Sequence, residues 1–301
     1  MKVSSLIKSL VKKTYIKIFH YFRSFTSPWR RNPDFIIIGV QKGGTTSLYR
    51  YLCEHPDIIP ALKKEVHYYD KKIHLGSFWY KKHFPLKYIH SNKICGEAYP
   101  YFFFHPLAAQ RIKQDLPDVK LILLLRHPVE RAYSHFQMEV RKKHEYSPDF
   151  LLAIKQERGK IEIEKNRIIN NPEYISWMHP RFSYIERGKY YEQLVQWFKF
   201  FRREQILILK SENLFSRTNF ELDRVHQFLG IRHIPLKKIE AFSKGLYQPL
   251  KNVLSEKEYG KLKILFRDDV ELLSKELGNE FEWDILNSAD DIEDTRLNTT
   301  L

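Results

Sequence analysis

Cysteine is scarce in this chain, which has only Cys53 and Cys95 among its 301 residues. Two thiols that lie so far apart cannot form a zinc ribbon, and the sequence contains no H-E-x-x-H pair. We therefore expect no bound metal. So few cysteines also favour a cytoplasmic location, where thiols stay reduced.

Long hydrophobic runs are missing from residues 1–33, because lysines interrupt every apolar stretch. Neither a transmembrane helix nor a signal peptide is predicted there. The segment has eight Lys or Arg and no Asp or Glu. Its apolar residues share one helical stripe, which is typical of a peripheral helix on anionic lipid, whereas a helix packed on the core or a loose basic extension is the alternative. The stripe consists of Ile7, Val11, Tyr15, Ile18 and Phe22.

The composition is that of one globular unit followed by a polar end. With 43% apolar and 15% aromatic residues, the chain can bury a large core, and we expect one catalytic α/β domain over residues 34–286. Residues 287–301 are polar and acidic, and we expect them to be disordered. The net charge of +15 favours acidic glycans, other polyanions or a membrane surface, although a solvated lysine-rich surface explains part of it equally well.

A phosphate-binding turn is the most informative feature. Residues 35–38 are the apolar run FIII, followed by GVQKGGTTS over residues 39–47. This order predicts a buried strand, a glycine turn and a helix whose first N–H groups point at one anion. The spacing of Gly39 and Gly44 fits a Walker A loop, but Thr45 stands where the lysine belongs and the lysine is at position 42. A glycine-rich turn with a surface lysine is the alternative.

A second anion motif follows a second apolar run. Residues 119–125 predict a buried parallel strand, and Arg126 stands directly after it. Ligands of open α/β sheets bind at the carboxyl ends of strands, so Arg126 is placed to meet one. Ser134, about two turns into the following helix, can share that anion. An ion pair of Arg126 with Glu130 is the alternative.

These motifs resemble those of sulfotransferases that use 3′-phosphoadenylyl sulfate (PAPS), in the branch of the heparan sulfate N- and 3-O-sulfotransferases and many bacterial carbohydrate sulfotransferases. Residues 39–48 are similar to the family's 5′-phosphosulfate loop and residues 126–134 to its 3′-phosphate motif. A third block, RGKYYEQL over residues 187–194, is similar to a downstream helix of the family. The resemblance implies a P-loop-like, doubly wound parallel sheet flanked by helices.

The resemblance also implies roles in binding PAPS. Lys42 would contact the sulfonate end and the leaving oxygen, and Arg126 with Ser134 would hold the 3′-phosphate. The segment SKGLY over residues 243–247 is similar to a loop that closes over the nucleotide, with Leu246 at a position where arginine is common. From this loop we expect contributions of Lys244 and Gly245. The 5′-phosphate would be held by Gly43, Gly44, Thr45, Thr46 and Ser47.

The acceptor side resembles the family's Lys-Glu-x-His-Phe-Phe segment, which appears here as KEVHYYD over residues 64–70. The resemblance implies that Glu65 removes the acceptor's proton, and a sugar hydroxyl needs such a base near neutral pH. His67 and Asp70 are weaker candidates for orienting the acceptor. Ala98 stands where the animal enzymes have a lysine, so heparan sulfate itself is not carried over. Either another cation replaces that lysine or the acceptor is less acidic.

The expected reaction is direct in-line transfer from PAPS to a hydroxyl or amine of a glycan or glycolipid. A P-loop kinase or NTPase is one rival, but it would need a metal-binding acid at the strand end. A non-enzymatic binder of nucleic acid or membrane would explain the charge but not two anion motifs, so nucleic acid is not an expected partner. Animal relatives are Golgi proteins with a membrane anchor. The absence of an anchor from this sequence favours a cytoplasmic, bacterial enzyme at the membrane periphery, and a Golgi location is the alternative for a eukaryotic chain.

Between the motifs the sequence is less regular. We expect acceptor-side loops from the end of the first helix to about residue 94 and an irregular charged segment over residues 141–187. The aromatic stretches 78–80 and 99–104 can stack on sugar rings or fill the core. Further helices are expected near residues 45–54, 106–115, 129–143, 191–201 and 219–229, with one or two more over 255–277 and a strand over 206–210.

Overall fold

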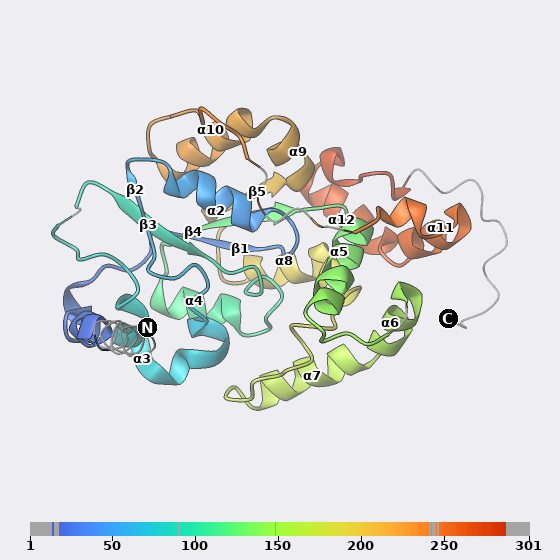
Figure 1. Cartoon of the computed structure of the whole chain (residues 1–301), viewed down its shortest axis with the longest axis horizontal. Coiled ribbons are helices and arrows are strands. Elements are labelled where there is room, and N and C mark those ends of the chain that lie inside the picture. The colour runs from blue at the N-terminus through green and yellow to red at the C-terminus, as the bar shows by residue number, and fades with distance from the viewer. Residues whose placement is uncertain are drawn as a thin grey trace, which may run out of the picture.

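The computed structural model describes residues 14, 18–89, 91–147, 149–240, 242, 245 and 247–286. Lys244, most of residues 1–17 and the acidic end from residue 287 lie outside this set. Five parallel strands form one sheet in the order β2-β3-β1-β4-β5 (Figure 1). The strands are β1 (Phe35–Gly39), β2 (Ile58–Pro60), β3 (Ile94–Ala98), β4 (Lys120–Leu125) and β5 (Ile206–Lys210).

Helices cover both faces of the sheet (Figure 1), which confirms the predicted doubly wound α/β fold. Successive strand residues point to opposite faces. In β1, Phe35 and Ile37 pack with α2 (Thr45–Cys53) and α10 (Thr218–Leu229), while Ile36 and Ile38 pack on the other side. That other side is covered by α4 (Ala108–Asp115) and α8 (Tyr190–Phe198).

A further group of helices packs beside the sheet around a third, aromatic core. Its buried rings include Phe136, Phe150, Tyr184 and Phe266. The helices of this group are α5 (Pro128–Arg141), α6 (Phe150–Glu157), α11 (Glu256–Ile264) and α12 (Arg267–Leu277). Helix α7 (Lys160–Asn170) follows α6, and the short elements used below are η1 (Ser27–Trp29), α3 (Gly76–Lys81) and α9 (Ser211–Ser216).

The order of the strands places two carboxyl ends side by side. From β1 the chain passes through α2 to β2 at one edge, whereas from β4 it continues to β5 at the other edge. β1 and β4 are neighbours in the sheet. Strands that lead away in opposite directions leave a crevice at their carboxyl ends, where open α/β sheets bind ligands.

The loop after β1 packs against β4 without room for a side chain. A Cβ atom on Gly43 would lie 2.8 Å from the carbonyl oxygen of Leu124 and 2.9 Å from Cγ2 of Val40. The Val40 N–H also donates to Leu124 O at 2.9 Å. Only glycine at position 43 therefore lets the turn approach the central strand this closely.

The region before residue 94, predicted as loops, contains strand β2 and helix α3, and β3 follows it directly. That prediction was wrong because β2 and α3 are short and each buries a single residue, so neither shows a period in the sequence. β3 was not predicted, because it lacks a continuous apolar pattern. Glu97 lies in its buried part, where it accepts hydrogen bonds from the Tyr80 hydroxyl at 2.5 Å and the Val66 N–H at 3.4 Å. Burial raises the pKa of Glu97 to about 8.

The segment 141–187, predicted as irregular, forms helices α6 and α7 in its middle. Their buried residues recur at helical spacing, but two of these positions hold Glu157 and Glu164, which hides the periodicity. Glu157 accepts from the N–H groups of Tyr184, Ile185 and Glu186. Glu164 accepts from the hydroxyls of Tyr174 at 2.8 Å and Ser176 at 2.5 Å.

The other predicted elements are confirmed within a few residues at each end, and the 255–277 region forms two helices, α11 and α12, within the one or two that were predicted. The aromatic stretches mostly fill the core, since Tyr80, Tyr99, Phe102 and Phe103 are buried and Phe78 is exposed. In the part of the chain that the structure covers, no helix is long and apolar enough to cross a membrane.

A test of the close contact between loop and sheet is the Gly43→Ala substitution. The added methyl group must displace main-chain atoms of Leu124 or Val40, so the free energy of unfolding should fall by about 1–3 kcal/mol. Gly260→Ala is the matched control, because no atom lies within 4 Å of its added Cβ and helix α11 should gain about 0.5–1 kcal/mol. Urea unfolding followed by tryptophan fluorescence measures both, and equal effects would contradict the packing described.

Candidate active site

The loop between β1 and α2 forms an anion cradle. Gly44 has φ +90°, a left-handed conformation that suits glycine, and it is the N-cap of α2. Gly44 has no side chain that could cap this helix, so among the described residues no N-cap acceptor occupies the N–H groups of its first turn. Thr45 and Thr46 occupy that first turn and line the adjacent cavity. The helix therefore presents N–H donors and hydroxyls to a bound anion.

Lys42 lies in the same loop with an uncommon backbone conformation, φ +71°, for a residue with a side chain. Such strain of about 1–3 kcal/mol persists where the surroundings hold the residue in place. Burial, together with the nearby cations Arg141, Arg126 and Lys142, lowers the pKa of Lys42 to about 8. An anion in the cradle would compensate for this concentration of positive charge.

Arg126 follows the last residue of β4, next to the cradle. Its Nη1 atom donates to the carbonyl oxygen of Lys42 at 3.1 Å, and its own carbonyl accepts from the Tyr190 hydroxyl at 2.7 Å. Among the residues that the structure describes, no carboxylate is within ion-pair distance of Arg126, so the alternative of a pair with Glu130 is not observed. The guanidinium keeps donors for a ligand.

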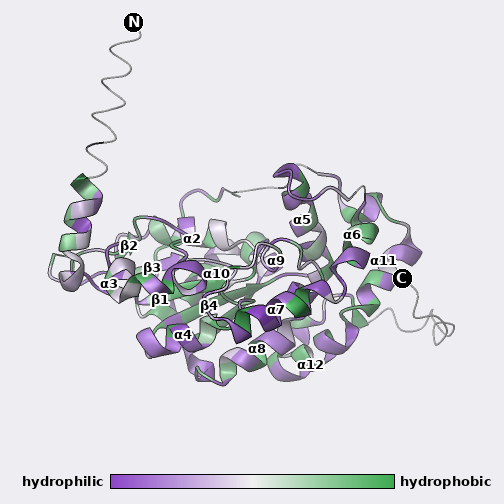
Figure 2. Cartoon of the chain, turned by 90° about the horizontal axis from the view of Figure 1, so that it is seen from below, coloured by the Kyte–Doolittle hydropathy of each residue, from purple (hydrophilic) through white to green (hydrophobic). Residues whose placement is uncertain are grey.

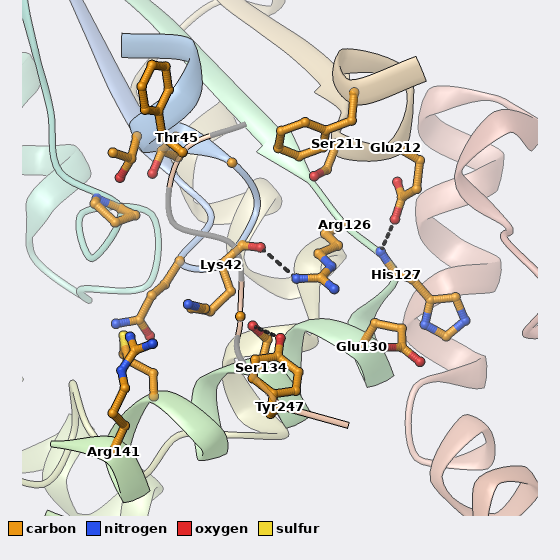
Figure 3. A pocket seen from close by; sticks show the side chains of 18 of the residues that line it. Lys42, Thr45, Arg126, His127, Glu130, Ser134, Arg141, Ser211, Glu212 and Tyr247 are labelled. Atoms are coloured by element: carbon orange, nitrogen blue, oxygen red, sulfur yellow. Dashed lines mark hydrogen bonds between the residues drawn. The ribbon is translucent and has the colours of Figure 1, made fainter. Parts of the chain in front are cut away.

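Ser134 lies on α5, two turns after Pro128, and is 2% exposed. Its Oγ accepts a hydrogen bond from the Tyr247 hydroxyl at 2.6 Å (Figure 3). We did not identify Tyr247 from the sequence, since the contact joins segments 113 residues apart. Met138 and Arg141 line the same cavity, and their spacing from Ser134 on one helix face is the signal that could have identified Arg141.

One cavity of about 1140 Å³ joins the two anion motifs (Figure 3). It is lined from the β1 side by Lys42, Thr45 and Thr46, and from the β4 side by Arg126 and Ser134. Several further charged side chains surround it, and because their charges balance, Lys42 and Arg126 give the lining its excess of positive charge. The further side chains are the cations Lys64, Arg141 and Lys142 and the carboxylates Glu65, Glu130 and Glu212.

Glu65 lies on the wall of this cavity, on the segment before η2 (Tyr68–Lys72), and its side chain is 38% exposed. Lys64 Nζ is 3.4 Å from Glu65 Oε1 and donates to Thr46 Oγ1 at 2.7 Å. Burial lowers the pKa of Lys64, although Glu65 opposes this shift. The cation therefore links the candidate base to the first turn of the anion-binding helix.

His67 and Asp70 lie behind Glu65 and do not line the cavity. His67 Nδ1 is 3.3 Å from Asp70 Oδ2, which also accepts from the Tyr99 hydroxyl at 2.9 Å. Burial opposes ionisation of Asp70, but these hydrogen bonds outweigh it and the pKa of Asp70 is lowered. The pair is placed to hold the turn that carries Glu65.

Of the other residues predicted to contact the cofactor, some line the cavity and others do not. Gly43 and Ser47 lie beneath the cavity surface, and Ser47 Oγ accepts from the Phe242 N–H at 3.3 Å. Gly245 lines the cavity, so the segment similar to the closing loop does reach the site. Lys244 lies outside the described residues.

Arg187 is a buried side chain that contacts the cradle through Gln41. It is 1% exposed, and its Nη1 donates to Gln41 Oε1 at 2.6 Å. Its guanidinium also lies over the rings of Tyr101 and Phe104, with centroid distances of 5.0 and 5.3 Å. Burial lowers the pKa of Arg187 to about 10. Gln41 was missed by the sequence analysis, because nothing in the loop pattern indicates its partner.

Within the described ranges, no group of three or more His, Cys, Asp or Glu side chains is arranged to hold a metal ion. What the site offers is a set of fixed cations, N–H donors and hydroxyls that face one cavity, with a carboxylate at its edge. Such a set can bind a ligand with two anionic groups and accept a proton beside it.

Comparison with known proteins gives relatives of one kind. The membrane-associated sulfotransferase kil1 of Dictyostelium discoideum is 30% identical over an alignment 319 positions long, which covers 83% of this chain and 66% of that protein. The human heparan sulfate glucosamine 3-O-sulfotransferase 6 is 31% identical over 209 residues, covering 69% of this chain and 55% of that protein. This chain thus spans between half and two thirds of the length of these curated relatives.

A solved structure agrees with these relatives. The crystal structure of a sulfotransferase from Alicyclobacillus acidocaldarius superposes with a TM-score of 0.63 at 26% identity, covering 81% of this chain and 95% of that one. The family model described as sulfotransferase domain matches residues 32–254, which include the cradle, Glu65, Arg126 and Ser134. The chain therefore belongs to the sulfotransferase family.

Proposed function

We propose that this protein transfers the sulfonyl group of PAPS to a hydroxyl or amine of a carbohydrate acceptor. The observation that carries the proposal is the convergence of two anion-binding motifs, from the adjacent carboxyl ends of β1 and β4, on one cavity with Glu65 at its wall. PAPS has two anionic ends, a 5′-phosphosulfate and a 3′-phosphate. A single phosphate would need only one of the motifs.

The residues fit these two ends. The N–H groups at the start of α2, with Thr45 and Thr46, would hold the 5′-phosphate. Arg126 and Ser134 would hold the 3′-phosphate, and the Tyr247 hydroxyl that now donates to Ser134 would rotate toward it. Gly43 and Ser47 would act only through their main-chain N–H groups, since neither residue lines the cavity. Lys244 and Gly245 would close over the nucleotide.

In the proposed reaction, Glu65 takes the proton of the acceptor as its oxygen or nitrogen attacks sulfur. The bond from sulfur to the 5′-phosphate oxygen breaks in line, and negative charge develops on that oxygen. The ammonium of Lys42 and the N–H groups of the cradle would stabilise this charge, and fixed donors do so without reorganisation. His67 and Asp70 would act as positioning residues, through the turn that they hold.

A glycan is the acceptor that the relatives support. The human relative is named for the glucosamine of heparan sulfate. Ala98, at the position of a lysine in the animal enzymes, is fully buried, and its N–H donates to the carbonyl oxygen of Lys64 at 3.4 Å. Position 98 therefore supplies no positive charge to an acceptor. With the cation of the animal enzymes missing there, we favour a less acidic glycan or glycolipid over heparan sulfate as the acceptor.

The rival kinase or NTPase is not favoured. Such enzymes place an acid at a strand end to hold Mg²⁺, whereas β4 is followed by Arg126. The cytoplasmic location expected from the scarcity of cysteine stays a prediction. Peripheral membrane contact through residues 1–33 is proposed as well, and the membrane association in the name of the kil1 relative supports it.

The nucleotide site is tested with 3′,5′-adenosine bisphosphate (PAP), the product of the proposed reaction. Calorimetric titration should show PAP binding that persists in EDTA and weakens by about tenfold or more in Arg126→Ala, because a charge-assisted contact is worth about 1.5–3 kcal/mol. ATP with Mg²⁺ is the comparison ligand. Binding of ATP with Mg²⁺ but not of PAP would instead support the kinase.

The low pKa of Lys42 predicts a pH dependence of PAP binding. The ammonium exists below about pH 8 and is lost as the pH rises through that value, so affinity should fall by up to about tenfold per pH unit above it. The phosphates stay ionised over this range, since their second pKa is about 6. In Lys42→Arg the fall should be absent, because a guanidinium keeps its charge. Parallel profiles of the two proteins would show that Lys42 does not contact the nucleotide.

Glu65→Gln separates catalysis from binding. The amide keeps the size of the side chain but cannot accept the acceptor's proton, so kcat for transfer of labelled sulfonate from PAPS to a panel of glycans should fall by about 10²–10⁴-fold. PAP affinity should stay within about twofold. Glu54→Gln, at an exposed position after α2, is the matched control and should keep full activity. Unchanged kcat in Glu65→Gln would remove Glu65 from the mechanism.

A further inference from the structure

The helix of residues 18–25 presents its apolar side chains to solvent. Ile18, Tyr21, Phe22 and Phe25 are 63, 78, 55 and 68% exposed, and their spacing places them on one stripe. A helix at the surface of a globular protein normally turns such a stripe toward the core. Here the stripe faces outward, and in Figure 2 the helix stands out from the edge of the domain.

Polar residues fix the helix in this orientation. Arg23 donates to the carbonyl oxygens of Lys82 at 2.6 Å and Phe84 at 2.8 Å, and Arg30, just after η1, donates to Phe84 O at 2.8 Å. Ser27 and Arg30 are buried. The face that touches the domain is thus the polar one, and hydrogen bonds to main-chain carbonyls keep the apolar face in solvent.

A second segment, distant in sequence, extends the same surface. The N–H of Arg31 donates to Pro85 O at 3.1 Å, and the N–H of Lys87 donates to Trp29 O at 2.9 Å. Residues 71–93 therefore lie against the N-terminal helix, as the neighbouring positions of that helix and α3 show in Figure 1. The exposed apolar side chains of this segment are Leu75, Phe78, Tyr88 and Ile89, and Trp29 adds a ring 52% exposed.

Almost all of the net positive charge comes from these two stretches of the sequence. Residues 1–33 contain eight Lys or Arg and residues 71–93 contain six Lys, and neither segment has an Asp or Glu. The rest of the chain has 37 Lys or Arg against 36 Asp or Glu. The net charge of +15 therefore comes almost wholly from these two stretches of sequence, and the cations among their described residues are Arg23, Arg30, Arg31 and the six lysines of 71–93. Cations and rings also mix at short range, with Lys81 Nζ 5.8 Å from the Phe78 ring and Lys82 Nζ 4.9 Å from the Trp79 ring.

We propose that the helix of residues 18–25 and the segment 71–93 together form a docking surface for a membrane rich in anionic lipids. Aromatic and aliphatic side chains on one exposed stripe enter the boundary between headgroups and acyl chains, and lysines beside them pair with anionic headgroups. Each lysine near such a surface contributes about 1 kcal/mol. The helix lies in the plane of the membrane and does not cross it.

The charge argues for lipid over a second copy of the chain as the occupant. A symmetric dimer would bring the same patch of two molecules together. Both patches lack any acidic side chain, so they would repel each other. An anionic membrane instead offers acyl chains to the exposed apolar side chains and negatively charged headgroups to the lysines beside them.

The test is sedimentation of the full-length protein with vesicles of phosphatidylcholine alone and with phosphatidylcholine containing about one third phosphatidylglycerol. We expect binding to the anionic vesicles that weakens with salt, and little binding to the neutral ones. The double variant Phe22→Ser with Phe25→Ser should bind about tenfold more weakly or worse, since two rings no longer leave water. Lys81→Gln with Lys87→Gln should bind about tenfold more weakly as well.

Phe220→Ser is the matched control, because this ring on α10 is 56% exposed and lies away from the surface. It should bind anionic vesicles like the wild type. Far-UV circular dichroism of every variant shows that the fold is intact. PAP titration tests the proposed function separately, so failure of this proposal and failure of the proposed function are distinguishable.

Equal binding to neutral and anionic vesicles, or binding that neither double variant weakens, would overturn the proposal. The molar mass measured by light scattering tests the alternative that a second copy of the chain occupies this surface. A dimer that the Phe22 and Phe25 substitutions convert to a monomer, with vesicle binding unchanged, would assign the surface to self-association and would likewise overturn it.

Discussion

The close approach of the β1 loop to β4 is the contact on which the candidate site depends. Gly43 lacks a side chain, so the turn can lie against the carbonyl of Leu124, and Lys42 and Arg126 are then close enough for a hydrogen bond between the Arg126 guanidinium and the Lys42 carbonyl. Because β1 and β4 lead to opposite edges of the sheet, a crevice is left between their carboxyl ends, and residues of both anion motifs line it. The result is a cavity with Lys42 on the β1 side and Arg126 on the β4 side.

Buried polar groups hold the surroundings of this cavity in place. Arg187 links Gln41 of the cradle to the aromatic segment after β3, and Glu157 binds three consecutive N–H groups just before Arg187. Each such group is costly to bury unless it is paired, so each fixes the geometry of the segments that it joins. The same principle operates at the surface, where Arg23 orients the N-terminal helix through main-chain carbonyls. Arginine thus orients both the cradle loop and the solvent-exposed apolar stripe of the N-terminal helix.

Sequence patterns predicted the elements whose residues are apolar without interruption. Uninterrupted apolar runs predicted β1, β4 and β5, and helical periodicity predicted the helices near them. The glycine turn follows the first of these runs, and Arg126 follows the second. The prediction failed where buried positions hold glutamates, at Glu97 in β3 and at Glu157 and Glu164 in α6 and α7. A carboxylate satisfied by distant N–H and O–H groups looks like a surface residue in the sequence, since its partners are 10 to 31 residues away.

The sequence by itself determined the family, the fold class and the two anion motifs, because glycine spacing, strand hydrophobicity and a strand-end arginine are local features. Tertiary structure alone decided which residues share the cavity. It placed Tyr247 on Ser134 and Arg187 on Gln41, and it left Ser47, His67 and Asp70 off the cavity wall. Tertiary structure also decided that the amphipathic stripe of the N-terminal helix faces solvent. Periodicity shows that a helix has two faces, and only the contacts of Arg23 and Arg30 with distant carbonyls settle which one is buried.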